Sequence, residues 1–392
     1  MPTLKELARA SLPLQLVPQR GNAIMNDTSG FGAGQLEEPQ SAFAFEGVWR
    51  EFLPIALTNL LLTIVTLGIY RFWAQARERR YLWSRTRFID DVFEWTGTGK
   101  EMFIGFLIVF LVIIPIFVGA SFAAQALLLR QEFAAAAIIF TILYAGTFYL
   151  IGVAQFRALR YRLSRSWWHG IRGGSDDGGW HYGWQSIWKT VVGWMAGGLL
   201  VPWSMTSLWN DRWNKMSFGQ HQFEAHAEIG NLIVRWLAIF LVPFAGMLLM
   251  GIGMAAWFAA SGGEPPSDAG AMMTGVGIVI GVLAFYLAFL VATVSYYAAF
   301  YRQVAAATSI AGIEFEFTAR TRDWMKLILG NIGLVIVTLG VGLLFLTYRN
   351  WSFAVRHLEA SGNVDLDALF QSPTRATTDA EGLADAFDIG AI

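Results

Sequence analysis

Asn59 and Asn331 each stand inside an otherwise apolar stretch, and each is followed six residues later by a Val-Thr-Leu-Gly motif. A side-chain amide in an apolar segment must find a hydrogen-bond partner, often on another helix. Transporters place binding sites where helices of repeated units are interrupted. These asparagines, with the motif residues Thr66 and Thr338, are therefore candidates for a polar centre of broken helices that lines a pore. The alternative is structural: an interhelical hydrogen bond, or the cap of a broken helix.

Two other polar clusters could hold a metal ion, but each is better explained as a loop. His221 and His226 are five residues apart, which places them on different faces of a helix and on opposite faces of a strand. Asp176 and Asp177 could offer oxygen ligands to a divalent cation, yet their Gly-rich run matches neither an EF-hand nor a P-loop. No Ser-His-Asp or HExxH signature is present, and the chain has no cysteine. We therefore expect no catalytic residue, no bound metal and no cofactor.

The composition is typical of a membrane protein. Hydrophobic residues make up 55% of the chain and charged residues only 15%, whereas soluble domains carry roughly 25% charged residues. The net charge of −1 gives no general case for nucleic-acid binding. The expected partners are thus membrane lipids and not nucleic acid. Assembly into a homo-oligomer, and a protein partner at the cytoplasmic face, are open possibilities.

Four segments exceed the roughly 20 apolar residues that a spanning helix needs, and they form two hairpins, 102–156 and 236–300. None of the four contains Asp, Glu, Lys, Arg or His, which argues against proton coupling because pumps usually carry intramembrane carboxylates. The predicted segments are residues 102–129, 133–156, 236–260 and 274–300.

Three further apolar segments, 52–73, 187–209 and 324–348, are interrupted by Gly, Pro or Asn. They could span the membrane, lie in its interface, or enter it and return on the same side. If only the four uninterrupted segments span, 27 of the 28 Lys and Arg residues fall on one side, as is typical of the cytoplasmic face. Seven spans would distribute the basic loops over both sides. We therefore favour re-entrant segments and cytoplasmic termini, with seven spans or interfacial helices as alternatives.

These patterns predict an all-α polytopic membrane protein with internal repeats and short cytoplasmic β-strands. The strands are expected at residues 43–47, 93–97 and 315–319, where aromatic residues alternate and the run closes on a small residue. The expected divisions are a flexible lead at 1–42, a first repeat at 43–173, a second repeat at 174–312, a partial third repeat at 313–358, and an acidic, mostly disordered tail at 359–392.

Basic and aromatic residues follow several apolar segments. Trp and Tyr favour the membrane–water interface, and Lys and Arg mark its cytoplasmic side. We therefore expect a set of topology and interface anchors after the interrupted segments and after the first hairpin. These are Arg71, Trp73, Arg77, Arg80, Tyr81, Arg160, Tyr161, Arg212 and Trp213.

The runs FAFEG, NLLLTIVTLGIYRFWAQARERRY and FEWTG together resemble the YjgN family of bacterial inner-membrane proteins, a domain of unknown function numbered 898. The resemblance covers about residues 43–392, including the terminal GLADAFDIGAI. Phe72 departs from the family pattern, in which we expect a proline before the Trp. The resemblance implies a multi-pass protein of the bacterial cytoplasmic membrane. It implies no activity and no site residues.

Two hypotheses of function follow. Repeated units with broken helices favour a transporter or channel-like protein for a small solute or a lipid. The alternative is a non-transporting membrane scaffold or sensor that acts through its cytoplasmic strands and its tail. Neither hypothesis makes the protein an enzyme. A cavity beside the two asparagines would favour the first, and a packed centre would favour the second.

Overall fold

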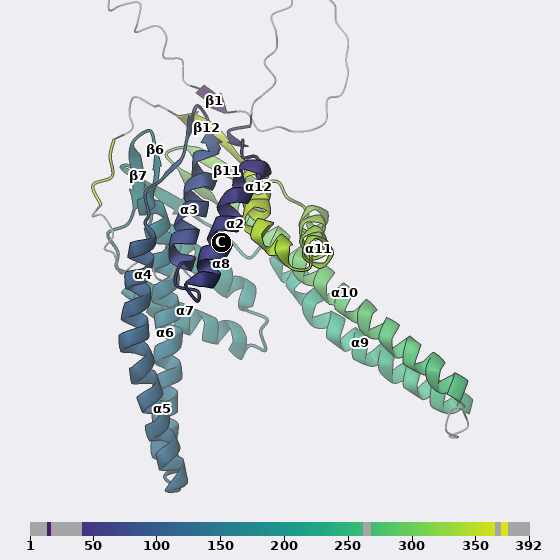
Figure 1. Ribbon diagram of the computed structural model, residues 1–392. Coiled ribbons are helices and arrows are strands. Elements are labelled where there is room, and N and C mark those ends of the chain that lie inside the picture. The colour runs from purple at the N-terminus through teal and green to yellow at the C-terminus, as the bar shows by residue number, and fades with distance from the viewer. Residues whose placement is uncertain (1–13, 17–40, 262–267, 365–369, 375–392) are drawn as a thin grey trace, which may run out of the picture.

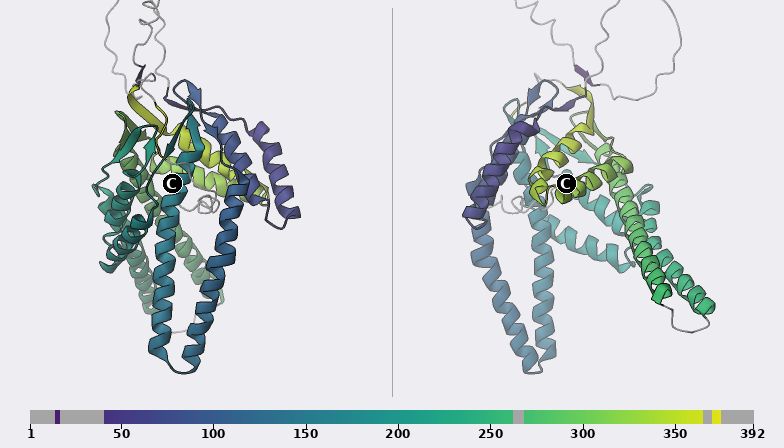
Figure 2. Two further views of the ribbon diagram at one scale, coloured as in Figure 1. Left: turned by 90° about the vertical axis from the view of Figure 1, so that its left-hand side faces the viewer. Right: turned by 45° about the vertical axis from the view of Figure 1, so that its right-hand side comes forward.

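Two long helical hairpins extend from a body of strands and short helices and diverge from each other (Figure 1, Figure 2). The computed structural model describes residues 14–16, 41–261, 268–364 and 370–374. The first long hairpin consists of α4 (Gly99–Ile108), a π-helical turn (Val109–Ile113), α5 (Ile114–Leu129) and α6 (Phe133–Arg165), and the second of α9 (Leu232–Ser261) and α10 (Asp268–Ala306).

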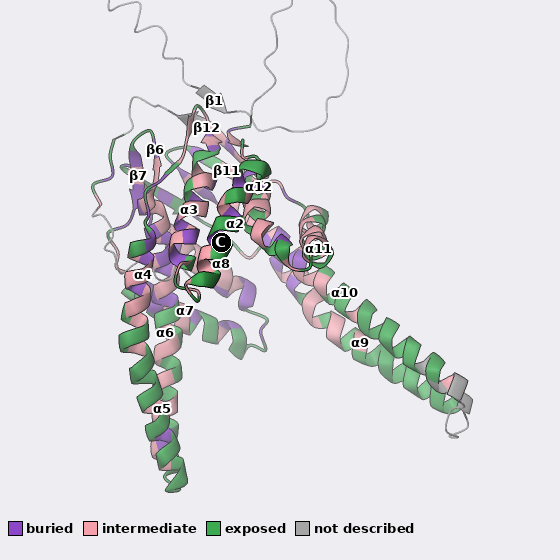
Figure 3. Cartoon of the chain, viewed as in Figure 1, coloured by how far each residue is buried: buried purple, intermediate pink, exposed green. Residues whose placement is uncertain are grey.

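Four helices of these hairpins are long and apolar enough to cross a membrane, and they coincide with the four predicted segments. Few residues in their most apolar windows are buried, and none in the windows of α9 and α10. Figure 3 shows this exposure along the far ends of both hairpins. An apolar helix exposed on nearly every side is stable only where lipid or another apolar surface replaces water.

Each interrupted segment forms two helices that fold back on each other. Hairpin 1 consists of α2 (Trp49–Val65) and α3 (Arg71–Ser84), and hairpin 2 of α7 (Trp180–Met195) and α8 (Val201–Trp213). Hairpin 3 consists of α11 (Thr321–Val337), a 3₁₀ turn (Val341–Phe345) and α12 (Leu346–Arg356). A strand precedes and follows each of the three, so each segment returns to the body that it left.

The prediction of an all-α fold is wrong in one respect, because the helices leave from a large antiparallel sheet. Nine described strands form a curled sheet in the order β1-β12-β11-β10-β9-β8-β7-β6-β5, and three more form the sheet β2-β3-β4. The strands are β1 (Leu14–Leu16), β2 (Phe43–Phe45), β3 (Thr86–Phe88), β4 (Asp91–Val92), β5 (Glu94–Trp95), β6 (Ser166–Trp168), β7 (Ile171–Gly174), β8 (Ser217–Phe218), β9 (His221–Ala225), β10 (Thr308–Ile310), β11 (Ile313–Phe317) and β12 (Leu358–Val364).

The three predicted strands are present as β2, β5 and β11, but they do not pair with one another. β2 pairs with β3, β5 with β6, and β11 with β10 and β12. Their partners follow helices, and in β3, β6 and β10 a Ser or Thr marks the change. The hydroxyls of Thr86, Ser166 and Thr308 donate to the carbonyl four residues earlier at 2.8, 2.8 and 2.7 Å. Each hydroxyl satisfies a carbonyl that the ending helix leaves unpaired.

Tight turns then reverse the chain between paired strands. His169 and Gly170 have φ values of 50° and 69° between β6 and β7, and Ala311 and Gly312 have values of 50° and 79° between β10 and β11. Positive φ at both central residues is the geometry of the two-residue turn whose twist matches that of paired strands. The body is therefore a series of β-hairpins that alternate with helical hairpins.

Strands of both sheets contribute to the largest of the described hydrophobic clusters. Phe88 of β3, Phe223 of β9 and Ala360 of β12 belong to the same buried cluster, although these strands lie far apart in the sheets. Phe156 of α6 and Tyr182 of α7 enter the cluster from the helices. The indole N–H of Trp168, itself in the core, donates to the Phe88 carbonyl at 3.1 Å. The sheets thus hold the helix ends in fixed relative positions.

Most of the predicted lead and tail lies outside the described residues. Within the lead, Leu14–Leu16 forms β1, which pairs with β12. Within the tail, residues 359–364 continue β12, and residues 370–374 are described beyond it. Residues 1–13, 17–40, 365–369 and 375–392 lie outside the description, and these include the run GLADAFDIGAI.

Glu316 and Glu359 face each other across β11 and β12. Burial, and then the Glu316 carboxylate, raise the pKa of Glu359. A carboxyl group whose pKa is raised on folding destabilises the folded protein as the pH rises from the unfolded pKa of the group through its folded pKa. We expect Glu359→Gln to raise the stability by about 0.5 kcal/mol at pH 7 and to have no effect below pH of about 4. Thermal unfolding in detergent measures both.

The matched control is Glu314→Gln, because Glu314 faces Ser361 on the same strand pair. It should leave the midpoint unchanged at both pH values. An equal effect of the two substitutions would show that the Glu316–Glu359 repulsion is not the cause.

Candidate membrane-interface site

The three short hairpins end in exposed apolar tips. Leu67 of hairpin 1 and Leu339 of hairpin 3 are each 94% exposed, and Met195 of hairpin 2 is 80% exposed. The turn of hairpin 1 points the same way as the long hairpins (Figures 1 and 2). Further exposed apolar residues of the tips are Ile64, Val65, Ile69, Trp194, Ile336 and Val337. Contiguous apolar surface of this kind marks an interaction site with lipid or protein.

Hairpins 1 and 3 turn with the same backbone geometry. The N–H of Gly68 donates to the Thr63 carbonyl at 2.7 Å, and the N–H of Leu67 donates to the Ile64 carbonyl at 3.1 Å. These two bonds form the Schellman motif, in which the residue after the helix takes a left-handed conformation. Gly340 and Leu339 make the corresponding bonds at 2.8 and 3.2 Å in hairpin 3, to Val335 and Ile336.

The left-handed residue of this motif is normally a glycine. In hairpins 1 and 3 it is a leucine: Leu67 has φ 51° and Leu339 has φ 49°. In hairpin 2 the corresponding place is held by Gly197, with φ 65°. An L-residue other than glycine in this conformation costs roughly 1–2 kcal/mol. Both leucines are therefore strained as well as exposed.

Thr66 and Thr338 lie at the breaks, where their hydroxyls connect the two helices. The Thr66 hydroxyl donates to the Leu62 carbonyl at 2.7 Å and accepts from the Tyr70 N–H at 2.9 Å. The Thr338 hydroxyl donates to Leu334 at 2.6 Å and accepts from the Gly342 N–H at 2.6 Å. These contacts agree with the structural alternative, the cap of a broken helix.

Asn59 lies between the two helices of hairpin 1 and is only 3% exposed. Its side-chain N–H donates to the Ala74 carbonyl at 3.2 Å and to the Glu78 carboxylate at 3.3 Å. Its carbonyl accepts from Arg77 at 3.3 Å. All the polar atoms of the Asn59 amide are thus directed at α3, and they tie α2 to it.

Asn331 makes the corresponding contact in hairpin 3, where its amide donates to Asn350 at 2.9 Å. Asn350 follows Asn331 by 19 residues, as Glu78 follows Asn59. Each asparagine therefore binds within its own hairpin. Hairpins 1 and 3 pack against each other through aromatic residues instead, with Trp83 and Trp351 stacked at 4.1 Å.

Hairpin 2 has a charged version of this interhelical contact. Lys189 of α7 is buried, and its ammonium donates to the Ser207 hydroxyl at 2.6 Å and to the Asp211 carboxylate on α8. Sequence reasoning missed this pair. The available signal was a lysine inside the apolar segment 187–209, with an acidic residue just beyond the segment's end.

The anchors expected on α3 divide into two groups. Arg71 and Arg80 are exposed, as interface residues would be. Arg77 binds Asn59, and Trp73 packs on Phe103 at 5.4 Å. The Tyr81 hydroxyl donates to the Val48 carbonyl at 2.9 Å, which closes the base of hairpin 1.

The remaining expected anchors lie within the body. Arg160 donates to the Asp177 carbonyl at 2.8 Å, and the Tyr161 hydroxyl donates to Glu101 at 2.8 Å. Tyr161 is fully buried and Arg212 nearly so, while Trp213 packs on Phe223 at 4.9 Å. These four residues support the sheet and the helix ends.

No group of three or more His, Cys, Asp or Glu residues that could hold a metal lies within the described part of the chain. Asp177 accepts from the Gly179 N–H at 2.8 Å, as expected for a plain turn. His221 lies in β9 and His226 follows that strand.

Comparison with known proteins places the chain beside membrane proteins of unknown activity. The model of the family described as "Bacterial protein of unknown function (DUF898)" matches residues 40–386. The inner membrane protein YjgN of Salmonella typhimurium is 39% identical over 70 residues, 18% of each chain. Inner membrane protein YjgN of Escherichia coli K12 is 34% identical over 73 residues, 19% of this chain and 18% of that protein.

The alignments thus span less than a fifth of the length of these curated relatives. No solved structure matches the chain.

Substitution of Lys189 or Asp211 tests the interhelical contact of hairpin 2. Lys189→Met leaves a partly buried carboxylate without its cation, and Asp211→Leu leaves a buried ammonium. We expect each single change to lower the stability by about 2 kcal/mol, and the double variant to lose less than the sum by at least about 1 kcal/mol. Thermal unfolding of the unaltered chain, the two single variants and the double variant gives the coupling energy of this double-mutant cycle.

The neutral pair of hairpin 3 is the matched comparison. Asn331→Leu and Asn350→Leu should couple by only about 0.6 kcal/mol. Additive losses at Lys189 and Asp211 would mean that this contact does not hold the hairpin together.

Proposed function

This chain belongs to the DUF898 family of bacterial proteins, and we propose that it acts on lipids in the bacterial inner membrane. In this proposal the strand body lies at the cytoplasmic face, and the short hairpins insert their tips into the inner leaflet. The sequence left two hypotheses, a transporter of a small solute or a lipid, and a scaffold. The proposal is lipid transport.

The observation that carries the proposal is the conformation of Leu67 and Leu339. Each leucine is strained by roughly 1–2 kcal/mol and is 94% exposed. Transfer of a leucine side chain out of water contributes about 1.5–3 kcal/mol. Insertion into lipid therefore offsets the strain, whereas in water both the strain and the exposure are unfavourable.

The arginines of α3 limit how deep hairpin 1 inserts. Arg71 follows Gly68 by three residues and is exposed. A guanidinium is costly at the bilayer centre but stable among headgroups. We infer that only the tip enters the hydrocarbon, by about 5–10 Å, as amphipathic interfacial helices do. This arrangement lies between the re-entrant and the interfacial alternatives.

The proposed orientation rests on charge. With four spans, 27 of the 28 Lys and Arg residues lie on the side of the strand body, which fits the cytoplasmic face. The return of each short hairpin to the strands supports four spans over seven. Under this orientation both ends of the chain are cytoplasmic.

The exposure of the long hairpins favours lipid over a hydrophilic solute. The apolar windows of α9 and α10 contain no buried residue, and the predicted spans contain no Asp, Glu, Lys, Arg or His. A hydrophilic solute needs polar groups along its path to replace its hydration. Lipid chains need only apolar surface, which both hairpins offer on nearly every side.

We also infer that the body arose by duplication. Short helical hairpins between strands occur three times, and the contacts Asn59–Glu78 and Asn331–Asn350 have the same spacing. The Schellman turns with a left-handed leucine recur in hairpins 1 and 3. We propose residues 43–173, 174–312 and 313–358 as the repeat units.

One observation favours the scaffold as a second candidate. Residues 370–374 of the tail contact the sheet, where the Gln371 amide donates to the Gly170 carbonyl at 2.9 Å and Arg172 donates to the Thr374 carbonyl. The tail thus occupies a surface of the body that a protein partner could share.

Depth-dependent quenching tests the insertion of the tips. The chain has no cysteine, so single cysteines at Leu67 and Leu339 can carry a fluorophore. We expect quenching by lipids spin-labelled near the headgroup end of the acyl chain, and little quenching by aqueous iodide. Gln220→Cys, in the exposed turn between β8 and β9, is the control and should show the reverse. Iodide quenching at position 67 equal to that at position 220 would contradict insertion.

Reconstitution into liposomes tests the function. We expect the protein to accelerate the exchange of a fluorescent phospholipid between leaflets while a trapped hydrophilic dye is retained. Leu67→Gly with Leu339→Gly should slow the exchange, although removal of the left-handed strain should not lower thermal stability. Dye release would favour a solute channel. Absence of lipid exchange would overturn lipid transport and favour the scaffold.

A further inference from the structure

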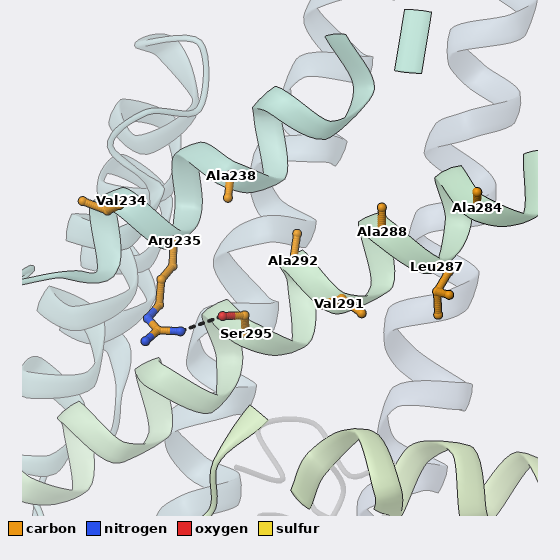
Figure 4. Close-up of a pocket in the computed structure, with 9 residues that line it drawn as sticks. All are labelled: Val234, Arg235, Ala238, Ala284, Leu287, Ala288, Val291, Ala292 and Ser295. Atoms are coloured by element: carbon orange, nitrogen blue, oxygen red, sulfur yellow. Dashed lines mark hydrogen bonds between the residues drawn. The ribbon is translucent and has the colours of Figure 1, made fainter. Parts of the chain in front are cut away.

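An open groove of about 600 Å³ lies between α9 and α10 (Figure 4). Its floor consists of small residues, and its sides of larger apolar ones. A methyl side chain fills little space, so the two helices leave a channel between their bulkier neighbours. The floor is formed by Ala238, Ala284, Ala288 and Ala292, and the sides include Leu287 and Val291.

The groove is polar at one end only. Arg235 and Ser295 are the two polar residues of its lining, and the guanidinium donates to the Ser295 hydroxyl at 2.6 Å. Figure 4 shows the Arg235 side chain reaching across from α9 to α10 at this end. Arg235 lies in the first turn of α9, next to the strand body, whereas Ala284 lies toward the far end of the hairpin.

Two more arginines stand near this end. Arg302 follows Ser295 by seven residues on α10, which places both on the same face of the helix. Arg302 donates to the Ala319 carbonyl at 3.0 Å and lies within electrostatic range of both Arg235 and Arg320. Among the described residues, the carboxylate that contacts this group is that of Asp323, which accepts from the backbone N–H of Arg320 and lies 3.6 Å from the Arg322 guanidinium. The positive charge therefore exceeds the negative charge here.

This arrangement has the polarity of a phospholipid: a cationic end at the proposed interface and an apolar channel that runs into the membrane. We propose that the groove binds an anionic phospholipid, with its phosphate on Arg235 and an acyl chain along the alanine floor. The inference rests on the proposed membrane orientation. The Arg235 guanidinium can bind phosphate through paired hydrogen bonds. The charges of Arg302 and Arg320 nearby favour a lipid with net negative charge over a zwitterionic one.

Lipid binding to the purified full-length protein tests the proposal. The probes are dioleoylphosphatidylglycerol, dioleoylphosphatidylcholine and inorganic phosphate, with retained lipid counted by native mass spectrometry. We expect selective retention of the phosphatidylglycerol and none of the phosphate ion. Arg235→Gln should weaken retention by about tenfold, as the loss of one charge-assisted contact predicts. Arg235→Lys should retain part of the affinity because it keeps the charge.

A second variant removes the channel without changing any charge. Ala288→Leu places a larger side chain on the floor and should also weaken retention of phosphatidylglycerol. Arg322→Gln is the control, because Arg322 is exposed and lies outside the groove lining, and it should bind as the unaltered chain does. Unchanged retention in both Arg235→Gln and Ala288→Leu would overturn the site, and so would equal retention of phosphatidylcholine.

The outcome is separable from that of the proposed function. Suppose that selective lipid retention is lost while the tips are still quenched by lipid labels and lipid exchange is intact. That result would contradict the proposed lipid site in the groove and would still support the proposed function. Selective retention in a protein whose tips are quenched by iodide would support the lipid site in the groove and contradict insertion of the short hairpins.

Discussion

A helix that reverses direction away from water must bond its N–H and C=O groups within the protein, and the turns of the short hairpins meet this requirement. A helix that reverses direction leaves several carbonyls and N–H groups without partners. In hairpins 1 and 3 two backbone bonds and one threonine hydroxyl satisfy groups at the break. The turn is closed on itself, so an apolar residue rather than a polar one can occupy its tip.

The strand body satisfies backbone groups at the other ends of the helices. Helix ends at the base of the hairpins would expose unpaired backbone groups, and the chain continues directly into strands that pair with their neighbours. Thr86, Ser166 and Thr308 mark these changes. Adjacent hairpins begin and end in strands of the same sheet. The sheet therefore sets the relative positions of the two long hairpins, which diverge away from the body. The paired strands at the base thus permit long hairpins that diverge and expose apolar side chains.

Polar residues in this protein serve mostly to join its own elements. Asn59, Lys189 and Asn331 each bind across one short hairpin, and Tyr161 binds Glu101 within the body. The described hydrogen bonds of the four residues that suggested a pore, which include Thr66 and Thr338, lie within their own hairpins. Arg235 differs, since it lies at the end of an open apolar groove rather than in the interior. Asn59, Lys189 and Asn331 thus stabilise the fold, whereas Arg235 is placed where a ligand in the groove can contact it.

The sequence by itself determined the four long helices and the three breaks. A run of about 20 apolar residues can satisfy its backbone only as a helix in lipid, and Thr-Leu-Gly closes a helix through local bonds. It also located β2, β5 and β11, whose alternating aromatics are a local pattern. Only the tertiary structure decided their partners, because strands as short as Ser217–Phe218 have no readable periodicity. It alone paired Lys189 with Asp211, buried Arg212 and packed Trp213 on Phe223, since contacts between distant residues depend on how helices cross and how the sheet curls.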